Sequence, residues 1–232
     1  MRLLQFRLSG TFAHFDQPIS NRFRNTYTVI PKPQLLGILG GLIGLDGYKN
    51  RNTLPEYYRI LNNLKVYIKC NNKTDIKFFV KYNSGLLNNR KDGITPSAMI
   101  SEQIIFKPDY EIGLLLDESD PIHNKICENI RNHCSEYPLY LGKNEFFANI
   151  DFIQYATYEI NSKNIIKCET VVPLEEIDKG QGNMRLELLP IGYNDKFKYI
   201  YKLMAIPQGN GIITVRNSQN FIICKESAYY VF

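Results

Sequence analysis

The chain has 232 residues, and its 28 lysines and arginines against 23 aspartates and glutamates give a formal charge of +5. A hydrophobic content of 44% excludes a disordered tail, a collagen-like repeat or a coiled coil. The length suffices to bury a core, in one large domain or two small ones, without disulfides.

The first predicted element is a strand, because apolar and polar residues alternate over positions 4–8. A long polar loop follows from Asp16 to Pro33, and the next acidic residue after Asp16 is Asp46. A loop of this length inside a compact domain is usually functional or disordered. Its cations and aromatic rings include Arg22, Phe23, Arg24, Tyr27 and Lys32.

A glycine-rich helix is predicted to begin at Pro33, a residue favoured at first helical positions. Gly37, Gly40, Gly41 and Gly44 fall on one stripe of this helix. Four glycines cost a helix about 4 kcal/mol relative to alanine, so we expect protein backbone to approach the stripe closely. A dinucleotide site is disfavoured, because its motif places glycines in the turn before the helix.

Two alternating segments, 64–70 and 76–82, predict a β-hairpin with one apolar face. The other face can hold phosphates and stack bases, or it is a solvated face on which lysine stems cover the rings. That face mixes cations with aromatic rings, namely Lys65, Tyr67, Lys69, Lys77, Phe79 and Lys81.

A polar, turn-rich segment over 83–101 predicts a protruding loop, and strand character resumes within 104–116. A second helix is expected to begin at Pro121. His123 and Cys127 lie one helical turn apart, as a metal pair would, but partners at ligand spacing are missing. We therefore expect no metal and no cofactor.

A further strand is predicted over 137–148, and from about residue 151 short strands follow one another between Gly/Asn turns. The order is β-α-β-β-α-β with an insertion, which is typical of ferredoxin-like and RRM-like domains. We therefore predict an α+β protein. A ferredoxin-like/RRM-like N-terminal domain would span 1–150, with the insertion at about 83–101, and a small β-rich domain would span 151–232.

Cysteine use and the length of apolar runs predict a soluble, cytoplasmic protein. The longest apolar stretch, Leu35 to Leu45, is far below the ~20 residues that cross a bilayer, and the N-terminus lacks an export signal. The absence of C-x-x-C spacing argues against a disulfide framework and a zinc module. The cysteines are Cys70, Cys127, Cys134, Cys168 and Cys224.

The net charge is unevenly distributed along the chain. Residues 17–91 hold thirteen cations and three acids, a net of +10, whereas residues 92–232 hold thirteen cations and nineteen acids, a net of −6. A concentrated basic region predicts a polyanion-binding surface, as in nucleic-acid-binding proteins. The alternative is a solvated basic face without a ligand.

Four stretches between residues 9 and 145 carry a family resemblance. They are 9–15 (SGTFAHF), 26–33 with the glycine-rich helix that follows, 104–112 (IIFKPDYEI) and 138–145 (PLYLGKNE). In their order and spacing they resemble the Cas-five family of CRISPR-associated proteins, within the RAMP superfamily, and its type I-B branch in particular. The C-terminal third is similar only in general character.

The resemblance implies a non-catalytic subunit of a type I Cascade surveillance complex in antiviral defence. Such a subunit has an RRM-like domain with a thumb, here at about 83–101, and caps the 5′ handle of the CRISPR RNA. Its partners would be this RNA, the backbone subunits and the large subunit, with target DNA read by base pairing. Carried over by position, the RNA-binding residues would be Arg22, Arg24, Tyr27, Lys32, Arg90, Lys91, Lys143 and Asn144.

The sequence is also compatible with two other functional classes. Type I-C relatives cleave precursor CRISPR RNA without a metal, so the alternative is an endoribonuclease built on His14 and Tyr27. The position of His14 in a Phe-Ala-His-Phe turn is more typical of a packed or hydrogen-bonded residue than of a general base. A small-molecule enzyme that uses the glycine-rich helix would bind a nucleotide. We expect the non-catalytic, RNA-binding subunit.

Overall fold

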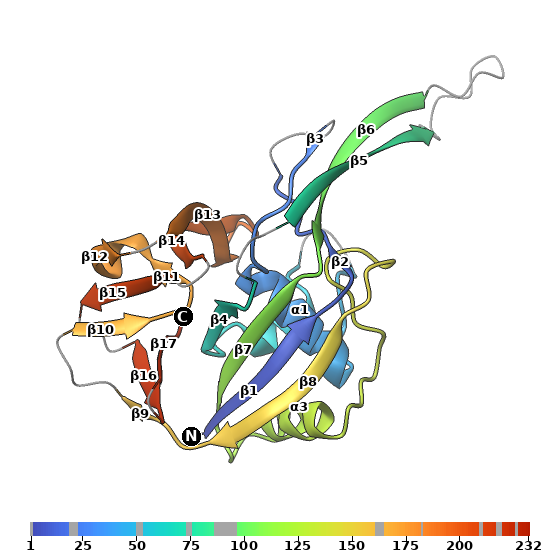
Figure 1. Cartoon of the computed structure of the whole chain (residues 1–232). Helices are drawn as coiled ribbons and strands as arrows, with labels where there is room; N and C mark the ends of the chain where they lie inside the picture. Colours follow the sequence, from blue (N-terminus) through green and yellow to red (C-terminus); the bar gives the residue numbers. More distant parts are fainter. Residues whose placement is uncertain are drawn as a thin grey trace.

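The computed structural model describes residues 2–18, 23–49, 53–72, 76–85, 97–160, 165–181, 183–208, 211–216, 220–225 and 227–232. α-Helices occur before residue 132 together with mainly antiparallel strands, and the described part of the chain beyond residue 156 is strand-rich, so the predicted α+β class is confirmed. Two groups of strands lie side by side, the first packed on the α-helices, and a two-stranded ribbon extends away from both (Figure 1).

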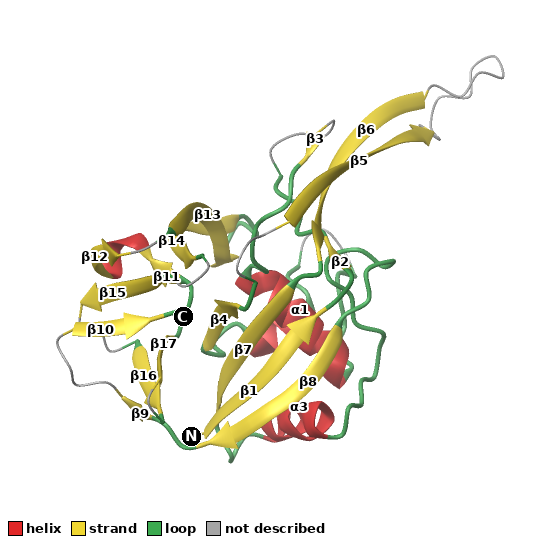
Figure 2. Ribbon diagram, viewed as in Figure 1, coloured by secondary structure: helices red, strands yellow, loops and turns green. Residues whose placement is uncertain are grey.

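The first sheet is antiparallel throughout. Its spatial order is β4 (Val66–Cys70), β7 (Asp109–Leu116), β1 (Arg2–Ser9) and β8 (Asn149–Ala156). Helices α1 (Lys32–Ile43) and α3 (Pro121–Arg131) cover one face of this sheet (Figure 2). The alternating residues Leu4, Phe6 and Leu8 of β1 are fully buried in the core beneath these helices. The four strands of this sheet and the two helices that cover it follow one another in the chain as β1-α1-β4-β7-α3-β8.

The predicted hairpin of 64–70 with 76–82 is wrong in its pairing. β4 pairs with β7, whereas β5 (Ile76–Gly85) pairs with β6 (Ser97–Phe106). Alternation identifies a strand, but burial decides which strand lies beside it. Ile68 on β4 is 1% exposed in the core, whereas Ile76 on β5 is 55% exposed.

The ribbon that extends from the body consists of β5 and β6 (Figure 1). The short strands β2 (Phe12–Ala13) and β3 (Phe23–Arg24) pair with β6 near the body. The protruding loop predicted at 83–101 is strand at both of its described ends, so the protrusion begins earlier in the chain than predicted. Its central residues, 86–96, lie outside the described residues.

The predicted strand over 137–148 is wrong, because most of this segment is a loop with one isolated bridge between Tyr140 and Phe147. Leu141 and Phe146 are buried in the core individually, which produces an apolar pattern without a strand. The strand that completes the first sheet, β8, begins at Asn149 instead.

The glycine stripe of α1 is closely approached, as predicted, but mainly by a side chain rather than by backbone. Helix α2 (Glu56–Leu61) packs there, and a Cβ on Gly40 would lie 3.0 Å from the Cγ of Tyr57. Gly44 has φ +84°, a left-handed conformation that favours glycine at the end of a helix. Of the described helices, none is both long and apolar enough to span a membrane.

Beyond Ala156, the described residues form strands and one 3-10 turn, η1 (Leu174–Glu176). A six-stranded sheet has the order β12 (Ile177–Gln181), β15 (Ile212–Arg216), β10 (Ile165–Cys168), β17 (Ser227–Tyr230), β16 (Phe221–Cys224) and β9 (Glu159–Ile160). A three-stranded sheet has the order β11 (Val172–Pro173), β14 (Tyr199–Pro207) and β13 (Met184–Tyr193). The division predicted at residue 150 falls inside β8, which stays paired with β1 up to Ala156.

One end of the sheet face opposite the helices is covered by this second group of strands. Leu3 and Tyr67 form a buried cluster with Ile222 and Val231. The ring of Tyr67 stacks on that of Tyr229 with their centroids 4.3 Å apart. The sheet face at this end is therefore part of the protein interior.

Candidate nucleic-acid interface

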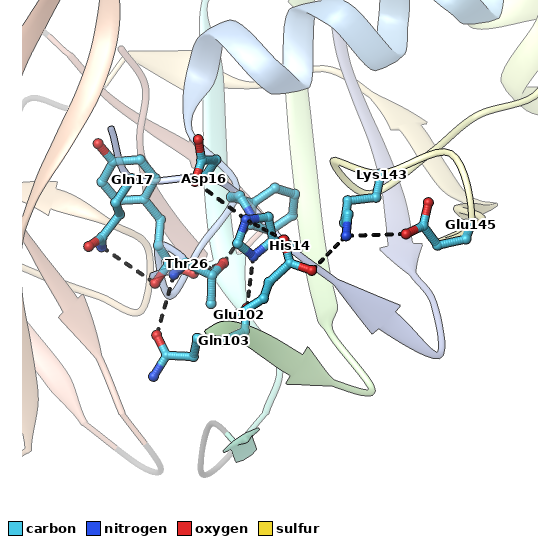
Figure 3. Close-up of polar contacts among 10 residues, drawn as sticks. His14, Asp16, Gln17, Thr26, Glu102, Gln103, Lys143 and Glu145 are labelled. Carbon is cyan, nitrogen blue, oxygen red and sulfur yellow. Dashed lines mark hydrogen bonds and ion pairs between the residues drawn. The ribbon is translucent and has the colours of Figure 1, made fainter. Parts of the chain in front are cut away.

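A buried group of charged side chains lies at the root of the ribbon (Figure 3). Glu102 of β6 is 2% exposed, and its Oε2 accepts a hydrogen bond of 2.6 Å from Lys143 Nζ. His14, which is 4% exposed, places Nε2 3.6 Å from Glu102 Oε1. Its Nδ1 lies 2.8 Å from the carbonyl oxygen of Gln103, which only accepts, so Nδ1 carries a proton.

Two exposed acids continue this cluster to the surface (Figure 3). Asp16 Oδ1 lies 3.5 Å from His14 Nε2, and Glu145 Oε1 lies 3.2 Å from Lys143 Nζ. Burial disfavours the charged form of Lys143, but hydrogen bonds to Glu102 and Glu145 outweigh it and raise the pKa of the amine. The cluster joins the segment after β2, strand β6 and the loop before β8.

The loop after β3 links the ribbon to the second group of strands. Thr28 Oγ1 accepts hydrogen bonds of 2.9 Å from Lys77 of β5 and from Arg185 of β13. The backbone N–H of Thr28 donates to Glu187 Oε2 at 2.9 Å. Burial raises the pKa of Glu187, although this hydrogen bond opposes the shift. Cations from two distant strands therefore meet at one threonine.

One side of the ribbon carries two exposed aromatic rings, a lysine and a methionine. We call it the platform face and define it as Phe23, Phe79, Lys81 and Met99. Phe79 and Lys81 are two residues apart on β5, so both point to the same side. Lys81 lies opposite Ser101, the residue of β6 that pairs with Phe23 on its other edge, and Asn83 lies opposite Met99. Phe23 is 60% exposed, Phe79 52% and Met99 64%.

The platform face replaces half of the cationic face predicted for residues 64–82. Lys77, Phe79 and Lys81 lie on β5, but Tyr67 is fully buried and Lys69 forms an ion pair with Glu169. Phe23 and Met99, which are distant in the sequence, take the place of the missing members. Periodicity identified the β5 residues but not their neighbours.

The predicted RNA-binding residues that the structure describes lie at several separate places. Arg24 is partly exposed on β3, and Asn144 is exposed beside the buried cluster. Lys143 lies within that cluster. Arg22, Arg90 and Lys91 lie outside the described residues.

Tyr27 and Lys32 are buried, so neither presents a surface to a polyanion in this structure. Tyr27 is 4% exposed, and burial, followed by a hydrogen bond to Tyr201, raises the pKa of its phenol far above the ordinary value. Lys32 is 9% exposed, and its Nζ donates a hydrogen bond of 2.9 Å to the carbonyl oxygen of Phe232. Lys32 was assigned to RNA binding by its position in the family resemblance, and position in the chain does not indicate whether a side chain is buried.

The buried amine of Lys32 predicts a rise of stability with pH. Burial, followed by the nearby charge of Lys65, lowers its pKa from 10.5 to about 8. Between these values the unfolded chain binds more protons than the folded one, so the free energy of unfolding increases with pH. Relative to Lys32→Met, the wild type should gain about 2 kcal/mol between pH 8 and pH 10, measured by urea denaturation. If the free energies of unfolding of the two proteins changed equally with pH, the lowered pKa assigned to Lys32 would be wrong.

The pair considered for RNA cleavage, His14 and Tyr27, is enclosed. The imidazole of His14 contacts Gln103, Glu102 and Asp16, and the burial of Tyr27 leaves its ring covered. A ribose hydroxyl would need access to both side chains for the proposed chemistry. Their placement is that of a structural junction.

In the part of the chain that the structure describes, no three His, Cys, Asp or Glu residues gather in a group that could hold a metal ion. His123 Nδ1 accepts a hydrogen bond of 2.9 Å from the backbone of Asp117, and Cys127 is buried. The pair singled out on the second helix is thus engaged in local packing.

No protein-family model matches the sequence, and no curated protein matches it. Among solved structures the chain is similar to one described as a CRISPR RNA-guided surveillance complex, at 12% identity and TM-score 0.52, over 92% of this chain and 90% of that one. It is similar to a CRISPR protein from Archaeoglobus fulgidus, at 12% identity and TM-score 0.53, over 100% and 98% of the two chains.

A third similar structure is the Type III-B Cmr-beta complex bound to cognate target RNA and AMPPnP, at 10% identity and TM-score 0.51, over 98% of each chain. Identities of 10–12% concern the fold, and the coverage extends over nearly the whole length. The chain is therefore similar in fold to CRISPR-associated proteins and to subunits of RNA-guided complexes.

Proposed function

We propose that this protein is a non-catalytic subunit of a CRISPR surveillance complex and that it binds the CRISPR RNA. In finer detail, we assign it to the Cas-five family of type I-B systems, with the 5′ handle of the RNA as its ligand. Backbone subunits and the large subunit would be its neighbours, and target DNA would be contacted indirectly through the complex. The observation that carries the proposal is the platform face.

The chemistry of the platform face suits single-stranded RNA. Exposed rings of Phe23 and Phe79 can stack on splayed bases, and Lys81 on the same side of the ribbon can neutralise phosphate. Stacking is worth about 1–3 kcal/mol per base and tolerates different bases. A two-stranded ribbon with such side chains is marginally stable in water, so a ligand on this face would also stabilise it.

The topology supports a ferredoxin-like assignment for residues 2–156, with the ribbon as the insertion and residues 157–232 as a second domain. The sheet order β4-β7-β1-β8 with helices after β1 and β7 is that of two interlocked β-α-β units. In RRM domains, aromatic side chains on the open sheet face stack RNA bases. Here the second group of strands packs over Tyr67 on that face, so we place the RNA on the ribbon.

Phe79→Ala and Lys81→Ala are expected to weaken RNA binding in different ways. Loss of the ring removes one stacking contact and should raise Kd by about tenfold, with the salt dependence unchanged. Loss of the lysine should raise Kd less at high salt and make the negative slope of log K against log salt less steep by roughly 0.7. The measurement is fluorescence anisotropy with the 5′ segment of the RNA that copurifies with the coexpressed subunits.

Two exposed residues elsewhere provide matched controls for these variants. Tyr137 is 52% exposed in the loop after α3, and Lys167 is exposed on β10. Tyr137→Ala and Lys167→Ala should bind the RNA as the wild type does. Equal losses in the platform and control variants, or no loss in either platform variant, would refute the platform as the RNA-binding face.

A further inference from the structure

Thr28 joins three parts of the fold at the root of the ribbon. Its hydroxyl oxygen accepts hydrogen bonds of 2.9 Å from Lys77 of β5 and from Arg185 of β13. Its backbone N–H donates to Glu187 of β13 at 2.9 Å, and its carbonyl oxygen accepts a bond of 3.1 Å from the hydroxyl of Tyr110 on β7. The ribbon, the first sheet and the second group of strands are therefore connected through one residue, which is 1% exposed.

The hydrogen bonds of the Thr28 hydroxyl are made within the protein. A hydroxyl has two acceptor lone pairs and one donor proton, and here both lone pairs face cations, Lys77 and Arg185. Burial raises the pKa of Glu187, and hydrogen bonds from the backbone and the side chain of Thr28 oppose that shift. Because its bonding capacity is used internally, Thr28 has the contacts of a structural junction rather than those of a ligand site.

This junction lies directly beside the platform face. Phe79 follows Lys77 by two residues on β5, so both side chains point to the same side of the ribbon. Gln103 lies opposite Phe79 on β6, and its Oε1 accepts a hydrogen bond of 3.3 Å from the backbone N–H of Thr26 (Figure 3). Lys77 also donates to the carbonyl oxygen of Thr26 at 3.1 Å. Two neighbours of Phe79 on the ribbon are thus bonded to the segment that contains Thr28.

The two sides of the ribbon are held by different parts of the protein. Glu102 points away from the platform face, because it alternates with Gln103 along β6, and it bonds to Lys143 in the loop before β8. The platform side is held through Thr28 to the second group of strands. A two-stranded ribbon is marginally stable alone, so its angle to the body depends on such contacts. Loss of the junction would leave the platform side without its bonds to β13.

We propose that Thr28 is a positioning residue for RNA binding, which holds the platform face in the orientation that RNA requires without touching the RNA itself. The inference rests on the proposed function, because its effect is on the affinity of the platform face. When only one orientation binds, the apparent Kd is the intrinsic Kd divided by the fraction of molecules in that orientation. The second group of strands then contributes to RNA binding through Arg185 and Glu187.

Thr28→Val tests the inference, because it removes the hydroxyl and keeps the shape of the side chain. In the anisotropy assay it should raise Kd by at least about tenfold, which corresponds to about 1.4 kcal/mol and is within the contribution of one hydrogen bond to a charged group. The bound complex keeps all its RNA contacts, so the slope of log K against log salt should be unchanged. The association rate constant should fall, with dissociation unchanged. Thr28→Ser, which restores the hydroxyl, should restore the affinity.

Thr170→Val is the matched control. Thr170 is also fully buried, and its Oγ1 accepts a hydrogen bond of 3.0 Å from the backbone N–H of Tyr230, within the second group of strands. It should leave Kd unchanged even where both valine variants lower the free energy of unfolding. A wild-type Kd in Thr28→Val overturns the inference, as does an equal loss of affinity in the two valine variants. A less steep salt slope or faster dissociation in Thr28→Val also overturns it, because the junction would then contact the RNA.

A measurement without RNA separates this inference from the proposed function. The chain contains no tryptophan, so Val80→Trp places a single one on β5, where the side chain is 37% exposed on the side away from the platform face. Its time-resolved fluorescence anisotropy should gain a fast segmental component when Thr28→Val is added. If that component appears but the wild type binds no RNA, Thr28 positions the ribbon and the proposed function fails. If the wild type binds RNA and the component is absent, the inference fails and the proposed function stands.

Discussion

Replacing Glu102 by alanine is expected to destabilise the protein by about 3 kcal/mol, measured as the free energy of unfolding in urea at pH 7. The side chain is 2% exposed and lies against Lys143 and His14. Its removal would leave the partly buried amine of Lys143 and the buried imidazole of His14 without the carboxylate that they share. Losing one partner of a buried charged pair costs more than the pair contributes, because the remaining group keeps its desolvation penalty.

The same lysine offers a matched control. Glu145 also pairs with Lys143, at 3.2 Å, but its side chain is 60% exposed. Glu145→Ala should therefore cost less than about 1 kcal/mol. A double-mutant cycle of Glu102→Ala with Lys143→Met isolates the coupling between the two residues. If Glu102→Ala proved as mild as Glu145→Ala, the cluster would not anchor the ribbon.

Gly113→Ala is expected to destabilise the protein by about 2 to 3 kcal/mol, because no space exists for a methyl group at this position. A Cβ there would lie 2.6 Å from Cζ of Tyr67 and closer still to two other ring atoms. The ring cannot shift freely, since it stacks on Tyr229 and its hydroxyl donates a hydrogen bond of 2.6 Å to Glu111. Thermal and urea unfolding both report the loss.

A control substitution at Gly47 and the same Gly113→Ala change in a Tyr67→Ala variant show whether contact with the tyrosine ring causes the loss of stability. Gly47 has no heavy atom within 4 Å of where its Cβ would lie, so Gly47→Ala should be neutral to within about 0.5 kcal/mol. In a Tyr67→Ala background, Gly113→Ala should cost less than about 1 kcal/mol, because the obstructing ring is gone. An equal cost in both backgrounds would show that the ring is not the cause.

Local pattern predicted the elements that bury one regular face. The alternation in β1 and the proline at the start of α3 each led to the right kind of element, and one face of each packs on a single core. The same reasoning failed for the loop before β8, where buried apolar residues belong to irregular backbone. It also failed for the partner of β5, since alternation says nothing about which strand lies alongside.

In the candidate site, too, local sequence pattern identified some residues and missed others. His14 and Lys143 were identified from the sequence, but Glu102 was not. The residues around an acid in a strand do not indicate whether its side chain is exposed or buried. Its burial depends on Lys143, 41 residues away in the chain. The platform face likewise joins Phe23 to Lys81 through β6, which no local window contains.

By itself, the sequence determined the α+β class, the position of most strands and helices in the first 131 residues, the glycine stripe that needs a close neighbour, and the concentration of positive charge in residues 17–91. The tertiary structure alone decided which of those cations face water. Lys32 is turned inward to a carbonyl oxygen 200 residues away, whereas Lys81 remains exposed on the ribbon. The physical reason is that periodicity is set by neighbours along the chain, whereas burial and strand pairing are set by contacts between residues distant in sequence.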